Sequence, residues 1–125
     1  MKLSSRLASI ALVMSVDGLG FAGLDAALAA TQQGNPMSGN PEAIAGGKKL
    51  FNTWCAQCHG SKAEGGKYGA NLKVFSKGYK EFLATVRDGR VQKMMPPWKD
   101  VLGDGSINEI GAYLETLAEP GANWK

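Results

Sequence analysis

One five-residue run, CAQCH at residues 55–59, constrains this chain more than any other feature. Residues three apart lie close together on a helical turn, so the thiols of Cys55 and Cys58 can both add to vinyl groups on one edge of a porphyrin. The adjacent His59 then places an imidazole under the porphyrin iron as its proximal ligand. The CxxCH pattern therefore predicts one covalently bound haem c, held by Cys55, Cys58 and His59.

Three other interpretations of the same residues fit the chain poorly. A redox-active CxxC of the thioredoxin kind needs a βαβ context, and no alternating strand pattern surrounds residues 55–58. A structural zinc site needs four ligands, but the chain has two cysteines and a single histidine. A disulfide between Cys55 and Cys58 would close a very short loop and stabilise the fold little.

The other axial ligand has to be found outside the CxxCH run. Because His59 is the only histidine, the sixth ligand of the iron is methionine, lysine, water or absent. Three of the five methionines lie near the N-terminus, at positions 1, 14 and 37, which leaves Met94 and Met95. Neighbouring residues of an extended segment point opposite ways, so one of this pair can face the iron, and Pro96 favours extended geometry at Met95. Both methionines stay candidates on these grounds, and both are compatible with simple core packing.

Three segments resemble the class I c-type cytochromes. MPPW at residues 95–98 is similar to their methionine-proline ligand segment, GKKLF at 47–51 to their helix before the attachment site, and IGAYL at 110–114 to their C-terminal helix. The resemblance runs from about residue 41 to about residue 118. It implies that Met95 is the distal ligand. It also implies an all-α, single-domain cytochrome c fold in which the N- and C-terminal helices cross over a haem-centred core.

One departure from that family concerns the proximal side of the haem. Many members carry Gly-Pro-x-Leu after CxxCH, and a carbonyl of that segment accepts a hydrogen bond from the proximal imidazole. Here the corresponding residues 68–72 read YGANL, and no proline lies between His59 and Pro96. An acceptor should still exist, because it fixes the ring and tunes the basicity of the ligand. The sequence leaves open which carbonyl supplies it.

Apolar periodicity and end signals predict three main helices and no strands. The first covers residues 42–51 with Asn40 as its cap, the second covers residues 79–88 and stops at Gly89, and SINE at 106–109 is a capping box that opens the last. Residues 60–77 are glycine-rich and predict a loop that wraps the haem. Gly47 and Gly111 would let the terminal helices cross closely, with Phe51 and Tyr113 around the crossing.

The N-terminus has the pattern of a secretory leader. Basic residues at positions 2 and 6 precede an apolar run over 7–16 and an A-x-A cleavage pattern at 27–29. We therefore divide the chain into a signal peptide (1–29), a flexible tail (30–40), a cytochrome c domain (41–119) and a C-terminal tail (120–125). Export agrees with haem attachment outside the inner membrane, so we expect a periplasmic protein that does not span the membrane once the leader is removed.

The charge distribution suggests how partners dock. The formal net charge is +3; five lysines fall between the attachment site and the middle helix, and two more flank the methionine segment. This lysine set comprises Lys62, Lys67, Lys73, Lys77, Lys80, Lys93 and Lys99. It would steer an acidic redox protein to the haem edge, although a solvated face is the usual role of such clusters. No aromatic-interleaved basic stripe is present, so nucleic acid is not expected as a partner, and we expect a monomer.

A His/Met-ligated iron has no open position for a substrate, and a methionine ligand raises its potential. The sequence therefore predicts a one-electron carrier and not an enzyme. One alternative is a ligand sensor or haem enzyme in which Met95 dissociates, and another is a fixed electron-transfer subunit of a larger complex. The stretch from Gly89 to Trp98 is also similar to cytochromes that accept electrons from quinoprotein methanol or ethanol dehydrogenases.

Overall fold

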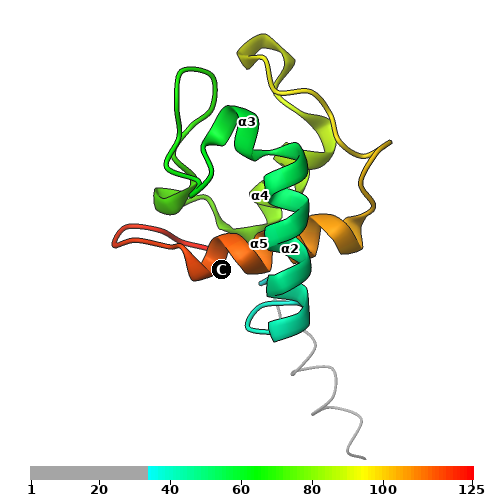
Figure 1. Cartoon of the computed structure of the whole chain (residues 1–125), viewed down its shortest axis with the longest axis vertical. Coiled ribbons are helices and arrows are strands. Elements are labelled where there is room, and N and C mark those ends of the chain that lie inside the picture. Colours follow the sequence, from blue (N-terminus) through cyan, green and yellow to red (C-terminus); the bar gives the residue numbers. More distant parts are fainter. Residues whose placement is uncertain (1–33) are drawn as a thin grey trace, which may run out of the picture.

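The computed structural model describes residues 34–125 and is all-α, as the sequence predicts. Its helices are α2 (Pro41–Trp54), α3 (Ala56–His59), α4 (Gly78–Asp88) and α5 (Asp104–Thr116), joined by the short 3-10 turns η1 (Leu72–Val74) and η2 (Val91–Lys93). Within residues 34–125 the single β-type pairing is an isolated bridge between Arg90 and Met95. The loop after α3 and the segment after α4 both lie above α5 in Figure 1.

The fold is organised by the crossing of α2 over α5 (Figure 1). Gly47 lies at the crossing, because a Cβ placed there would come within 1.9 Å of the backbone oxygen of Glu109 on α5. The ring of Phe51 is fully buried one turn further on, and its centroid lies 5.7 Å from that of Tyr113. The predicted close approach of the terminal helices, with Phe51 and Tyr113 packed around it, is thus confirmed.

Gly111 has a different role from the one the sequence suggested. A Cβ on Gly111 would meet the Asn35 side chain at 2.8 Å and the Phe82 ring at 3.0 Å, so this glycine faces α4 and the segment before α2. Asn35 is buried there and donates from Nδ2 to the backbone oxygen of Asn108, 2.8 Å away. Tyr79 on α4 donates its hydroxyl to Asn108 Oδ1 at 2.6 Å. The buried amides are therefore satisfied, as burial of a polar group requires.

The helix ends agree with the sequence in two cases and differ in one. The Asn40 side chain accepts from the backbone N–H of Ala43 at the start of α2, and Gly89 ends α4 with a positive φ of 69°. The last helix, however, begins at Asp104 after Gly103, and no side chain caps it. The predicted capping box at Ser106 is wrong, because the helix is already formed two residues earlier.

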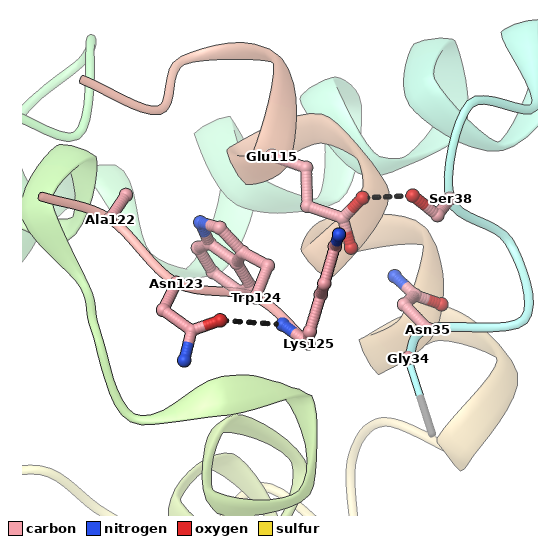
Figure 2. A pocket seen from close by; sticks show the side chains of 8 residues that line it. All are labelled: Gly34, Asn35, Ser38, Glu115, Ala122, Asn123, Trp124 and Lys125. Carbon is pink, nitrogen blue, oxygen red and sulfur yellow. Dashed lines mark hydrogen bonds between the residues drawn. The ribbon is translucent and has the colours of Figure 1, made fainter. Parts of the chain in front are cut away.

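Two segments predicted as tails belong to the packed structure. Residues 34–40 lie against α5, where Asn35 is buried and Ser38 hydrogen-bonds Glu115. Trp124 is 9% exposed, and its ring centroid lies 5.0 Å from that of Phe75 and 5.2 Å from that of Phe82. The two segments meet at a surface pocket of about 340 Å³ (Figure 2). Residues 34–40 of the expected flexible tail and the C-terminal tail at 120–125 thus pack against the helices in the described part of the chain.

The predicted signal peptide at residues 1–29 lies outside the described residues. Within residues 34–125, no helix combines the length and the apolar character that a bilayer crossing needs.

Candidate haem-binding site

The three residues of the predicted attachment site share one helical turn, with Cys55 at the junction of α2 and α3 and with Cys58 and His59 inside α3. The backbone N–H of Cys55 still bonds to Phe51 of α2, while the N–H groups of Cys58 and His59 bond to the Cys55 oxygen at 3.2 and 3.0 Å. The geometry therefore brings Cys55, Cys58 and His59 together, as their spacing predicts. Both thiols are free, the first partly buried and the second exposed.

The environment of the Cys55 thiol does not favour disulfide exchange. Burial, with a smaller contribution from the neighbouring Cys58, raises the pKa of the Cys55 thiol to about 11. A redox-active CxxC needs the opposite, a lowered thiol pKa that supplies thiolate at neutral pH. Residues 34–125 also hold no group of three or more His, Cys, Asp or Glu side chains arranged to bind a metal ion.

The orientation of His59 is set by a backbone carbonyl. His59 Nδ1 lies 2.8 Å from the oxygen of Ala70. A carbonyl can only accept, so Nδ1 carries the proton and donates, and Nε2 keeps its lone pair for a metal. Ala70 stands where the related cytochromes' Gly-Pro-x-Leu has proline, within GANL at residues 69–72. The acceptor that the sequence left open is therefore the carbonyl of Ala70.

Gly69 is a site residue that the sequence reasoning did not single out. A Cβ on Gly69 would lie 2.5 Å from the Cys58 oxygen and 2.9 Å from His59 Nδ1. The loop after α3 thus packs its backbone directly on the attachment turn, and a hydrogen bond of 2.7 Å from the Gly65 N–H to the His59 oxygen holds it there. The glycines of residues 60–70 were the available signal, because a close backbone approach favours glycine.

The methionine segment is a short, closed loop. Arg90 and Met95 exchange two backbone hydrogen bonds, of 2.8 and 3.1 Å, around the η2 turn. Met94 has a left-handed backbone, with φ 63° and ψ 17°, and its side chain is 67% exposed. Met95 is partly buried and packs against the hydrophobic core. The loop therefore turns the two neighbouring methionines in opposite senses, Met95 inward and Met94 outward.

The donor set suits a haem c. It comprises two free thiols one helical turn apart, an imidazole with an available Nε2, and an inward-facing thioether on a separate segment. The family model described as cytochrome c oxidase, cbb3-type, subunit III matches residues 42–114, more than half of the chain. The chain belongs to this cytochrome c family. This cytochrome is therefore an electron-transfer domain that carries covalently bound haem c.

Relatives and solved structures agree with that assignment. The cytochrome is 31% identical over 94 residues to the quinohemoprotein alcohol dehydrogenase ADH-IIG of Pseudomonas putida, and 29% identical over 92 residues to the cbb3-type cytochrome c oxidase subunit CcoP of Rubrivivax gelatinosus. These matches cover 71% and 70% of this chain but 13% and 30% of those proteins. The cytochrome thus spans a minor part of the curated relatives it matches.

Two cytochrome cL structures share the fold. Cytochrome cL of the methylotroph Methylophaga aminisulfidivorans superposes with a TM-score of 0.61 at 27% identity, over 87% of this chain and 74% of that one. Cytochrome cL of Hyphomicrobium denitrificans gives a TM-score of 0.55 at 23% identity, over 62% and 48% of the two chains. The second likeness concerns the fold alone.

The structure divides the lysine set into paired and unpaired members. Lys73 pairs with Glu119, and Lys99 Nζ lies 3.9 Å from Asp88. Lys67 lies over the Tyr68 ring at 5.2 Å. The two arginines near the methionine segment are also paired, Arg87 with Asp104 at 3.4 Å and Arg90 with Glu81 at 3.2 Å. Lys62, Lys77, Lys80 and Lys93 have no ion pair among the described residues.

Proposed function

We propose that Cys55 and Cys58 hold haem c through thioether bonds, and that His59 Nε2 and Met95 Sδ are the axial ligands of its iron. The observation that carries this proposal is the hydrogen bond from His59 Nδ1 to Ala70, because it leaves Nε2 as the one ring nitrogen available to a metal. The inward packing of Met95, against 67% exposure of Met94, supports the choice of methionine.

With both axial positions filled by the chain, the proposed role is one-electron transfer without catalysis of a reaction. Haem c supplies an iron that alternates between the ferrous and ferric states. The chain contributes rigidity, since Ala70 fixes the ring of His59 and the bridge between Arg90 and Met95 fixes the methionine loop. A thioether ligand opposite an imidazole favours the reduced iron and raises its potential, as in other His/Met cytochromes.

The proposed electron donor is a quinoprotein alcohol dehydrogenase, and the proposed compartment is the periplasm. Similarity to a quinohemoprotein alcohol dehydrogenase and to cytochrome cL of a methylotroph supports this donor class. A second candidate is a fixed electron-transfer module. It is favoured by the small share, 13% to 30%, of the curated relatives that this chain spans. The two candidates differ in whether the holoprotein exchanges partners by diffusion.

Haem attachment can be tested on the purified protein. Acid-acetone extraction should leave the haem with the polypeptide, because thioether bonds survive acid. Cys55→Ala should keep haem through Cys58 alone and shift the pyridine haemochrome spectrum, since one vinyl group then stays conjugated with the ring. Extraction of haem from the wild-type protein would contradict the attachment proposal.

Electron transfer and docking can be tested together by stopped flow. We expect a quinoprotein alcohol dehydrogenase to reduce the ferric holoprotein, at a second-order rate that falls as salt rises, because the Debye length is only about 8 Å at physiological ionic strength. Lys77→Glu with Lys93→Glu should lower this rate about tenfold or more and leave thermal stability nearly unchanged, since neither lysine has an ion-pair partner among residues 34–125.

The matched control reverses two charges elsewhere. Lys48→Glu with Lys49→Glu alters the net charge equally on the exposed face of α2, outside the lysine set, and should change the rate much less. If the two double variants slowed electron transfer equally, the docking rate would depend on the overall net charge and not on the lysine set. A rate that is first order and independent of protein concentration would favour the fixed module over the diffusing carrier.

A further inference from the structure

Two tryptophans from distant parts of the sequence meet next to the proposed iron ligands. Trp54 is the last residue of α2 and directly precedes Cys55, whereas Trp98 lies three residues after Met95. Their ring centroids are 5.7 Å apart, and the planes meet edge to face at 62°. Trp98 is partly buried against the core, while Trp54 remains 42% exposed. An aromatic contact thus joins the attachment turn to the methionine segment.

The methionine segment is otherwise fastened to α4. The N–H of Trp98 donates to the Val86 oxygen at 3.0 Å, and the N–H of Lys99 donates to the Arg87 oxygen at 3.3 Å. Gly89 lies against the same segment, because a Cβ there would come within 2.5 Å of Pro97 nitrogen. These contacts hold the segment to the helix before it. Among the aromatic pairs of residues 34–125, the Trp54–Trp98 pair is the one that ties the segment to α2.

We propose that Trp54 is a positioning residue for the distal ligand: its indole braces Trp98 and so keeps Met95 on the iron. The inference rests on the proposed function, because it requires Met95 as a ligand. Dissociation of a methionine needs its loop to move outward from the haem. Trp54 is bonded to Cys55, a proposed attachment residue, so movement of the loop away from the attachment turn would break the indole contact.

A simpler interpretation is that Trp54 is an exposed apolar residue with no special role. Single exposed apolar residues are common and need no special role. An edge-to-face pair, however, adds stabilisation beyond area burial, and this pair joins two segments that both carry proposed haem contacts. A brace should therefore affect ligand exchange at the iron more than it affects the global stability of the fold.

The test measures imidazole binding to the ferric holoprotein, which requires prior release of methionine. Trp54→Leu should increase the limiting rate of imidazole binding about 2- to 12-fold, the factor that the stabilisation typical of an aromatic pair gives. The methionine-to-iron charge-transfer band should disappear at a lower temperature, well below global unfolding. Trp54→Phe should behave nearly as the wild type, because a phenyl ring keeps the edge-to-face contact.

A double-mutant cycle separates a brace from two independent packing effects. Trp98→Leu breaks the same contact from the other side, and its effect should not add to that of Trp54→Leu. If Trp54→Leu yields no holoprotein, Trp98→Leu can be measured in its place. Tyr68→Leu removes an exposed aromatic residue that lies outside this contact and should leave the imidazole rate unchanged.

The outcomes distinguish the brace from the ligand assignment. An unchanged imidazole rate in Trp54→Leu, additive effects in the cycle, or Trp54→Phe as fast as Trp54→Leu would overturn the brace while Met95 ligation stands. A wild-type protein that lacks the charge-transfer band would overturn the ligand assignment itself, and the brace with it.

Discussion

Replacing Met95 with alanine should abolish the near-infrared-edge charge-transfer band of the ferric protein and open the iron to cyanide and carbon monoxide. No second histidine exists to replace the lost thioether. Met94 cannot substitute within the same loop, because its left-handed backbone directs a 67% exposed side chain outward. Cyanide affinity should rise at least about tenfold, since ligand bonding worth more than 1.4 kcal/mol no longer competes. The reduction potential should fall with the loss of the methionine ligand.

Met94→Ala is the matched control for this experiment. It removes the neighbouring thioether from the same loop, and alanine keeps the bridge between Arg90 and Met95. The charge-transfer band, the cyanide affinity and the potential should stay close to their wild-type values. A band that persists in Met95→Ala, or disappears in Met94→Ala, would contradict the assignment of Met95.

The site was predictable where its residues are contiguous. Cys55, Cys58 and His59 fall on one helical turn, so spacing alone brings them together. The hydrogen-bond acceptor of His59 comes from a loop that returns 11 residues later, and it is a backbone atom. Any residue type has that carbonyl, so the sequence could not select Ala70 as the acceptor.

Contacts between residues far apart in the sequence also explain why the packing of the chain ends was not predicted. Residues 120–125 are too few to show a periodicity, and the burial of Trp124 depends on Phe75 and Phe82 from elsewhere in the chain. Gly111 was expected to face the other terminal helix, but it faces Phe82 of α4 and Asn35, which lies in a segment with no apolar pattern. Helical periodicity and end signals located α2 and α4 within a few residues, because those depend on local sequence alone.

Gly47→Val should destabilise the protein more than any other substitution considered above. The added Cβ would lie 1.9 Å from the oxygen and 2.4 Å from the carbonyl carbon of Glu109, and 2.9 Å from the nitrogen of Ile110. These are backbone atoms of α5, so no side-chain rotation can make room, and the two helices must move apart. Separation would also open the contact between Phe51 and Tyr113. We expect a loss of about 3 kcal/mol or more in the free energy of unfolding of the holoprotein.

Gly47→Ala decides whether the crossing or helix propensity dominates at this position. Propensity alone favours alanine over glycine in a helix by about 1 kcal/mol, whereas the clash with Glu109 predicts a net loss of stability. Gly105→Ala is the control, because a Cβ at Gly105 of α5 meets nothing within 4 Å and should be neutral or stabilising by up to about 1 kcal/mol. Urea denaturation followed by circular dichroism measures both variants. A Gly47→Ala protein more stable than the wild type by the full propensity gain of about 1 kcal/mol would show that α2 and α5 are not in backbone contact, and the crossing on which this fold is built would have to be redrawn.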